Sequence, residues 1–193
     1  MRVFVAGATG AIGRFLVPML VDAGHDVAGM TRSPAKTAGI EEAGASAFIA
    51  DAYDADAVAA AVADFAPDVV VHQLTDLPRS AAGLAFKVAA NNRIRKVGTD
   101  NLLAAAKAAG GARVIAQSIG FPVPKIARRG PAHLEEAVLA ADGVVLRYGQ
   151  FYGPGTWSEA PPKKGPVVHV ETAAWRTVEH LEAAPGVYLI VDE

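Results

Sequence analysis

The segment 7–13 reads GATGAIG and places three glycines at intervals of three residues. Such a loop can bind phosphate groups: Gly7 permits a tight turn, Gly10 lets the backbone approach a pyrophosphate, and Gly13 allows a helix to pack closely on a strand. Backbone amides at the start of that helix would face the phosphates. The apolar segment before the loop and the helical segment after it favour this interpretation over a merely structural turn. We therefore expect a dinucleotide to contact Gly7, Thr9, Gly10, Ala11, Ile12 and Gly13.

The residues after the second apolar segment indicate which dinucleotide binds. Domains specific for NAD usually carry an acidic side chain at the end of the second strand, where it binds the ribose 2′-hydroxyl. Here the segment 27–33 reads VAGMTRS and has no acid at that end. Arg32 can instead pair with a 2′-phosphate, and Lys36 can add a positive charge. We expect NADP as the cofactor, with NAD as the alternative if both side chains are only solvated residues near a helix start.

Short apolar segments alternate with longer alanine-rich ones, and this alternation must position the loop. Strands are expected at 2–6, 25–31, 46–50, 68–73, 113–117, 144–148, 167–170 and 187–191, and helices at 11–23, 34–43, 55–65, 86–109, 132–141 and 172–183. Ser33 and Pro34 should cap and open the second helix. Strands that are apolar along their whole length and separated by helices indicate a parallel sheet covered on both faces. The fold class is α/β: a Rossmann-type, doubly wound parallel sheet with helices on both faces, formed as one domain by residues 1–193.

Composition and charge narrow the function classes. The chain has 193 residues, 52% of them hydrophobic and 20% charged, which suits a globular domain with a sizeable core. A net charge of −2 gives no reason to expect a nucleic acid or an anionic membrane as partner. The chain has no cysteine, which excludes disulfides and zinc–thiolate sites, and no window holds the roughly 20 apolar residues of a membrane span. We expect a cytoplasmic protein that binds a small-molecule substrate and no metal.

Further motifs follow the glycine loop in order, and together they resemble the short-chain dehydrogenase/reductase superfamily, especially its extended and atypical branch of NAD-dependent epimerases and dehydratases. They are Asp51 after the third strand, VVVHQLT at 69–75, GTDNLL at 98–103, QS at 117–118, LRYGQFYGPG at 146–155 and HVE at 169–171. The family counterparts of three of them read GTxNLL, LRxGxxYGPG and HVDD. The resemblance implies that a nicotinamide dinucleotide also contacts Asp51, Ala52, Leu74 and Thr75.

The catalytic pair of that superfamily is missing. Its oxidoreductases use a tyrosine with a lysine four residues later on one helix face, together with a serine. None of the four tyrosines, at 53, 148, 152 and 188, is followed by such a lysine. The matching positions fall near Ala127 or Arg128 and near Pro131 or Ala132.

The resemblance leaves Ser118, at the end of the fifth strand, and Tyr152, in the YGPG turn, as candidates for catalysis. The alternative for Ser118 is a helix cap or a loop residue. Tyr148 and His72 could also contact a reacting group, but packing within a strand and a polar strand end explain them more simply. The basic cluster 91–96, NNRIRK, is expected to be the solvated face of the long helix or, alternatively, to meet an acidic substrate.

The chain is short where members of the superfamily build a substrate-binding lobe. Relatives place more chain between the serine and the sixth strand than the 119–143 stretch, and 151–170 is interpreted as a remnant of the lobe. The segments 121–130 and 158–165 are rich in Pro, Gly, Lys and Arg and are expected to be flexible margins of omitted segments. Relatives also have a C-terminal lobe after the position of residue 193. Either the protein is a minimal form, or the sequence omits segments of a longer protein, which is the alternative we prefer.

Two functions follow from these residues. The first is an NADP(H)-dependent oxidoreductase or epimerase/dehydratase that acts on a carbonyl or hydroxyl carbon of a small molecule, with Ser118 holding the oxygen. The second is a non-catalytic NADP-sensing, dinucleotide-binding regulatory protein. The missing Tyr/Lys pair favours the sensor, whereas Ser118 and the YGPG turn favour the enzyme, which we prefer. Relatives often dimerise through helices like the one at 86–109, so a homodimer is a further expectation.

Overall fold

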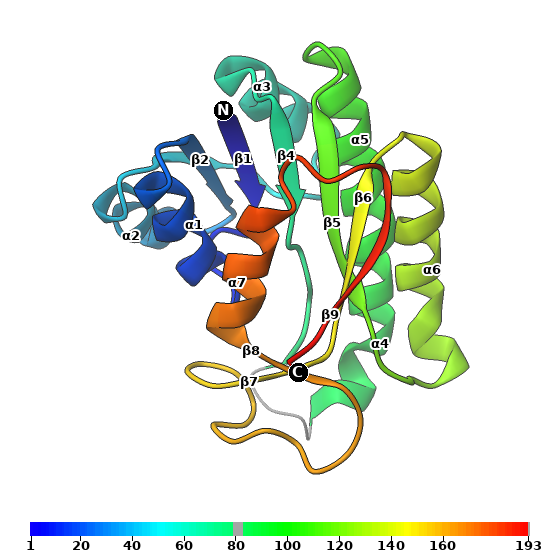
Figure 1. The fold of residues 1–193 in the computed structure, drawn as a ribbon. Helices are drawn as coiled ribbons and strands as arrows, with labels where there is room; N and C mark the ends of the chain where they lie inside the picture. The colour runs from blue at the N-terminus through cyan, green and yellow to red at the C-terminus, as the bar shows by residue number, and fades with distance from the viewer. Residues whose placement is uncertain (79–82, 193) are drawn as a thin grey trace.

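The computed structural model describes residues 1–78 and 83–192. Its strands are β1 Arg2–Ala6, β2 Asp26–Thr31, β3 Ser46–Ile49, β4 Val69–His72, β5 Arg113–Ile119, β6 Val144–Tyr148 and β9 Gly186–Ile190. They form one parallel sheet in the order β3-β2-β1-β4-β5-β6-β9 (Figure 1). The direction in which strands are added reverses between β1 and β4. In open sheets of this kind, ligands bind at the carboxyl ends of the strands beside that reversal.

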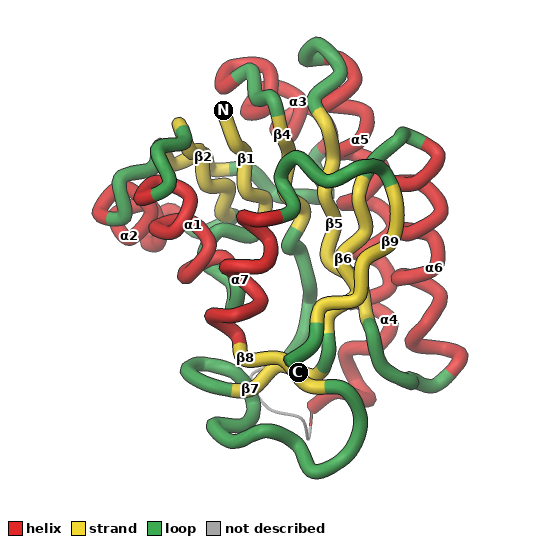
Figure 2. Tube along the Cα trace, viewed as in Figure 1, coloured by secondary structure: helices red, strands yellow, loops and turns green. Residues whose placement is uncertain are grey.

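Helices cover both faces of the sheet. They are α1 Gly13–Asp22, α2 Thr37–Glu42, α3 Ala55–Phe65, α4 Leu84–Arg93, α5 Thr99–Ala108, α6 Lys125–Ala140 and α7 Val170–Glu179. Figure 2 shows α1 and α7 on one face and α3, α5 and α6 on the other. Along β1, Val3 and Val5 belong to the core under the first layer, whereas Phe4 and Ala6 belong to the core under the second. This two-sided burial explains the uniformly apolar strands and confirms the predicted doubly wound α/β fold.

The segment after β2 differs from the single helix predicted over 34–43. A 3₁₀ turn, η1 Pro34–Lys36, precedes α2. Pro34 opens this turn as expected, but the Ser33 side chain forms no capping hydrogen bond. The Ser33 backbone amide instead donates to the Thr31 hydroxyl at 3.2 Å. The prediction that Ser33 caps a helix is therefore wrong, because the chain enters the turn through a local Thr31 contact.

The long helix predicted over 86–109 contains a π-helical turn, η3 Ile94–Gly98, between α4 and α5. Just after it, the Thr99 hydroxyl donates to the Arg95 carbonyl oxygen at 2.5 Å, a local bond that competes with regular helical bonding. The extra residue of a π turn changes which side chains face the sheet. Asn91, Ile94 and Arg95 are buried, so the predicted solvated face of 91–96 is wrong for these three residues.

Helix α6 begins seven residues before the predicted start at 132, since it runs from Lys125. Pro131 lies inside it and removes one backbone donor, which made the preceding segment look like a loop. The Asn92 side chain, which comes from α4, supports this part of the helix. Its amide nitrogen donates to the Ile126 carbonyl oxygen at 2.7 Å, and its oxygen accepts from the Gly130 amide at 2.7 Å. The expectation of a flexible margin over 121–130 is therefore wrong from residue 125 onward.

A second, two-stranded parallel sheet lies beyond the carboxyl end of β6 (Figure 1). It pairs β7 Gln150–Tyr152 with β8 Val167–His169, in a register that places Tyr152 opposite His169. The strand predicted at 167–170 is confirmed over 167–169, whereas the strand at 150–152 was not predicted. The small sheet brings the two ends of the 151–170 segment together, and the interpretation of that segment as a remnant lobe stays a prediction.

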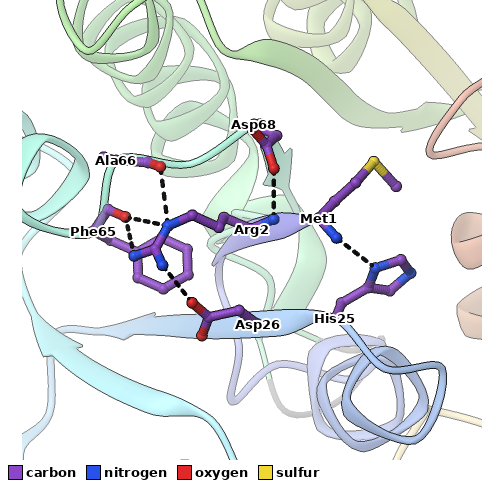
Figure 3. A network of polar contacts seen from close by, with 7 residues as sticks. All are labelled: Met1, Arg2, His25, Asp26, Phe65, Ala66 and Asp68. Carbon is purple, nitrogen blue, oxygen red and sulfur yellow. Dashed lines mark hydrogen bonds and ion pairs between the residues drawn. The ribbon is translucent and has the colours of Figure 1, made fainter.

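A polar network fixes the amino edge of the main sheet, opposite the carboxyl ends (Figure 3). The Arg2 guanidinium donates to the carbonyl oxygens of Phe65 and Ala66 and pairs with Asp26 at 2.5 Å. The Arg2 backbone amide donates to the Asp68 carboxylate at 2.7 Å. These bonds tie β1 to β2 and to the end of α3, so the strands that carry the glycine loop and its neighbours are held in a fixed register.

Within residues 1–78 and 83–192, no helix is long and apolar enough to cross a lipid bilayer. No three histidine, aspartate or glutamate side chains in those ranges are placed to hold a metal ion.

Candidate nucleotide-binding site

A cavity of about 230 Å³ lies at the carboxyl ends of the strands that flank β1. Eight of the eleven residues predicted to bind the cofactor line it: Gly7, Thr9, Gly10, Arg32, Asp51, Ala52, Leu74 and Thr75. The other three, Ala11, Ile12 and Gly13, lie at the start of α1 and do not form its wall. The topology therefore brings the residues after β1, β2, β3 and β4 to one concave surface.

The three glycines of the loop have different structural tasks. Gly7 has a φ of +95°, and a Cβ there would lie 3.0 Å from the backbone of Gln73. A Cβ on Gly13 would overlap the Gly7 carbonyl oxygen and lie 2.6 Å from that of Ala8. Gly10 is the least constrained, because its Cβ would only approach the Gly7 oxygen at 3.2 Å. Gly10 is thus the position whose missing side chain leaves space for a ligand.

The start of α1 provides donors for an anion. No side chain caps this helix at Ile12, and the first amides of any α-helix have no partner within it. The backbone amides of Gly7 and Ala8, in contrast, donate to the Met30 carbonyl oxygen at 3.4 Å, which fixes the loop against β2. A fixed loop, a glycine cradle and uncapped helix amides fit the pyrophosphate of a dinucleotide.

The end of β2 adds positive charge to the cavity. Thr31, Arg32, Ser33 and Lys36 all line it, and no acidic residue lies among them. Across the cavity, Asp51 accepts a hydrogen bond from the Tyr53 amide at 3.0 Å. Asn101 of the GTDNLL motif donates to the Ala52 carbonyl oxygen at 2.8 Å and so ties this loop to α5.

Tyr53 and Gln73 are among the cavity residues that the sequence did not predict. The Tyr53 ring lies under the Arg93 guanidinium, 4.5 Å from ring centre to Cζ; burial raises the pKa of the Tyr53 hydroxyl although Arg93 opposes the effect. Gln73 follows the last residue of β4 and is 6% exposed. Gln73 comes directly after β4 and Tyr53 lies in the loop that follows β3, and these positions at the carboxyl ends of strands are the signal that would have found them.

Ser118 lies outside this cavity. It is 1% exposed, and its hydroxyl donates to the Glu135 carboxylate at 2.5 Å. Arg147 donates to the same carboxylate at 2.5 and 3.1 Å, and Arg128 lies 3.9 Å from it. Burial alone would raise the pKa of Glu135, but the hydrogen bonds from Arg147 and Ser118 and the two arginine charges outweigh it and lower the pKa. Glu135 is therefore ionised and accepts a hydrogen bond from the Ser118 hydroxyl.

Tyr152 also lies away from the cavity wall. Its hydroxyl donates to the Asp192 carboxylate at 2.7 Å, a bond that raises the pKa of the tyrosine. Its ring meets His169 edge to face at 5.1 Å. Ser118 and Tyr152 are thus hydrogen-bonded to two different carboxylates, those of Glu135 and Asp192. Their catalytic roles stay predictions.

The simpler interpretations of Tyr148 and His72 are confirmed. Tyr148 is 1% exposed and hydrogen-bonded to the Thr177 hydroxyl at 2.6 Å, and burial raises its pKa to about 12. His72 is 1% exposed, with Nε2 at 2.9 Å from the Thr99 hydroxyl and Nδ1 accepting from the Leu74 amide at 3.1 Å. Burial and the charge of Arg95 lower the pKa of His72 to about 3.

The lowered pKa of His72 predicts that the protein becomes less stable as the pH falls. The unfolded chain protonates His72 near pH 6.5 and the native state only near pH 3, so the unfolded state binds more protons between these values. The contribution of His72 to the free energy of unfolding is fully present above pH 6.5. Below that pH it decreases by up to about 1.4 kcal/mol per pH unit. Urea unfolding between pH 7 and pH 5 should show this slope. His72→Gln should flatten it, and an unchanged slope in that variant would assign the effect to other groups.

Comparison with known proteins identifies a family for this chain. The NAD(P)H-binding family matches residues 7–148. The 3-diazoavenalumate denitrifying reductase of a Streptomyces species is 40% identical over 180 residues, covering 81% of this chain and 58% of the reductase. The aligned span is longer than the matched part of this chain, so the reductase carries additional residues within it. This chain thus matches little more than half the length of that relative.

Several solved structures have the same fold. The UDP-glucose 4-epimerase of Thermus thermophilus, in complex with NAD, has a TM-score of 0.82 at 22% identity and covers 99% of this chain and 78% of its own. The Bordetella bronchiseptica enzyme WbmH, in complex with NAD+, has a TM-score of 0.77 at 19% identity, with coverages of 99% and 75%. The cavity, the family match and these likenesses lead to one conclusion. The chain belongs to the NAD(P)H-binding family.

Proposed function

We propose that this protein is an NADP(H)-dependent reductase that binds the dinucleotide in the cavity between Gly7 and Arg32. One observation carries the proposal: the Gly7–Gly10 loop and the residues Arg32 and Lys36 line the same cavity. A nicotinamide cofactor supplies the hydride when bound. The chain would bind the phosphates, orient the ring and exclude water.

Positive charge at the end of β2 supports NADP over NAD. Arg32 offers a planar, permanently charged fork that suits a phosphate, and Lys36 adds a second charge beside it. An acidic residue that would repel a 2′-phosphate and bind a ribose hydroxyl is missing from this part of the cavity wall. The two cations at this end of the cavity support a contact with the extra phosphate of NADP.

Reduction is favoured over epimerisation on two grounds. The relative at 40% identity is named a reductase, whereas the epimerases are under 25% identical and support the fold alone. An epimerase that oxidises a carbinol also needs a base for the hydroxyl proton. The matching positions of α6 hold Ala127 or Arg128 and Pro131 or Ala132 instead of tyrosine and lysine. Hydride transfer to a small organic acceptor that takes no proton from the protein fits these residues better.

Arg32→Ala tests the cofactor assignment. The loss of a charge-assisted bond to the 2′-phosphate should weaken NADPH binding by about 10- to 100-fold and leave NADH binding within about twofold. Fluorescence titration of both cofactors measures this. Arg176→Ala is the matched control, because Arg176 lies on the exposed side of α7 and pairs with Glu179. Equal weakening of both cofactors would contradict the 2′-phosphate contact, and failure of the unaltered protein to bind either would contradict the proposed function.

A non-catalytic NADP sensor is the second candidate. The separation of Ser118 and Tyr152, each hydrogen-bonded to its own carboxylate away from the cavity, favours it. A sensor would bind NADPH tightly and leave it unoxidised in the presence of carbonyl and diazo acceptors, whereas a reductase would consume it with one of them.

A further inference from the structure

The turn 153–158 is hydrogen-bonded to two segments that lie far from it in the sequence. Near its start, the Pro154 carbonyl oxygen accepts from the guanidinium of Arg14, on the first turn of α1. Near its end, the Trp157 indole nitrogen donates to the Pro78 carbonyl oxygen at 3.0 Å. The turn therefore joins the helix that follows the glycine loop to the segment that follows β4.

The 153–158 turn is also fixed internally and fitted to α1. The Gly153 amide donates to the Ser158 carbonyl oxygen at 2.9 Å, and the Thr156 hydroxyl lies 2.9 Å from the carbonyl oxygens of both residues. Gly155 has a φ of +69°, and a Cβ there would overlap the Arg14 guanidinium. The turn would thus move as one unit, and its seat on α1 requires a glycine.

The cavity accommodates only part of a dinucleotide. Its volume of about 230 Å³ lies below the roughly 300–1,000 Å³ of most small-molecule sites. Its wall consists of the glycine loop, residues at the ends of β2, β3 and β4, and Ile94; among the described residues, none after β5 or β6 lines it. Since β2 and β4 flank β1 on opposite sides, a dinucleotide with its 2′-phosphate at Arg32 would extend its second nucleoside past Thr75 and Asp76.

The 153–158 turn lies beside this path. Its first contact is with Arg14, next to the last glycine of the loop, and its second is with Pro78, two residues after the cavity residue Asp76. Figure 1 shows the segment between β7 and β8, which contains the turn, beyond the carboxyl ends of β1 and β4. The turn thus connects the helix whose amides would bind the pyrophosphate to the segment that the second nucleoside would pass.

We propose that the 153–158 turn is a strap that retains the nicotinamide half of the dinucleotide, and that release of its contacts at Arg14 and Pro78 admits the cofactor. With the cofactor bound, the strap would cover the second nucleoside and exclude water from the hydride. The inference rests on the proposed function and adds a property to it: the cofactor leaves slowly because the strap must open first.

The test compares the release of two ligands from Trp157→Phe, which keeps an aromatic ring but removes the indole donor. NADPH holds both nucleosides, whereas adenosine 2′,5′-bisphosphate holds only the adenine half with its 2′-phosphate. Loss of one strap contact should accelerate NADPH dissociation about three- to tenfold and leave that of the bisphosphate within about twofold. Stopped-flow displacement of NADPH by excess NADP⁺, and of the bisphosphate by excess NADPH, measures both rates through NADPH fluorescence.

A second variant and a matched control complete the design. Gly155→Ala should also accelerate NADPH release, because its Cβ would push the turn away from Arg14 while both hydrogen-bond donors remain. Trp175→Phe is the control and should leave both rates unchanged, since Trp175 is exposed on α7. Melting temperatures within roughly 2–4 °C of the unaltered protein would show that each variant keeps its fold.

The pattern of rates decides the outcome. Unchanged NADPH release in both Trp157→Phe and Gly155→Ala would overturn the inference. An equal acceleration for NADPH and the bisphosphate would also overturn it, because the turn would then act on the adenine half or on the whole cavity. If the unaltered protein binds neither ligand, the proposed function itself fails, and the strap fails with it.

Discussion

Gly10→Val is expected to abolish NADPH binding, with an affinity loss of at least about 100-fold, in a protein that still folds. A Cβ on Gly10 meets only the Gly7 carbonyl oxygen, at 3.2 Å, and the backbone conformation there does not require glycine. The branched side chain would occupy the space through which a pyrophosphate approaches the backbone and the first amides of α1. Titration with NADPH, together with a circular dichroism melt, separates binding from folding.

Two other glycines provide the controls for this result. Gly13→Ala should destabilise the fold itself, because its Cβ would overlap the Gly7 oxygen and lie 2.6 Å from that of Ala8. Gly39→Val in α2 meets nothing within 4 Å and should leave NADPH affinity unchanged. Undiminished NADPH binding by Gly10→Val would show that the glycine loop is a structural turn.

The sequence predicted the fold well because its strands are buried on both faces. Seven of the eight predicted strands belong to the main parallel sheet, with ends within one or two residues of those predicted, and the one predicted at 167–170 lies in the small sheet. Arg32 and Lys36 could be linked to Gly10 in advance, because the carboxyl ends of neighbouring parallel strands must meet at one edge. Local pattern and overall topology agree for these residues.

The failures have a different physical origin, since they depend on contacts between distant segments. Helix α6 starts early because the Asn92 side chain, which belongs to α4, is hydrogen-bonded to the backbone of Ile126 and Gly130. The burial of Arg95 depends on the π turn and on a bond from its guanidinium to the Gln117 carbonyl oxygen at 2.7 Å. Burial lowers the pKa of Arg95 to about 10, although Glu135 opposes the shift. No periodicity of charges or apolar residues predicts such contacts.

Glu135 connects three elements, and its removal has the largest effect that we expect on stability. Its carboxylate accepts bonds from Ser118 on β5 and from Arg147 on β6, and it belongs to α6. Glu135→Leu would leave a buried hydroxyl and a guanidinium without their partner. We expect a loss of about 3 kcal/mol in the free energy of unfolding, the low end for a broken buried pair, because the Arg147 side chain is 37% exposed and water can solvate it.

Urea unfolding of three variants tests this role of Glu135. Glu136→Leu, next to it on the exposed side of α6, should change stability by less than about 0.5 kcal/mol. Glu135→Gln keeps an acceptor for Ser118 but loses the charge. Its loss in the free energy of unfolding should therefore lie between those of Glu136→Leu and Glu135→Leu. Since the pKa of Glu135 is lowered in the native state, its stabilisation is present at neutral pH and is lost as pH falls through that lowered value. An equal, small effect of Glu135→Leu and Glu136→Leu would contradict this role and would mean that apolar packing alone holds α6 on the sheet.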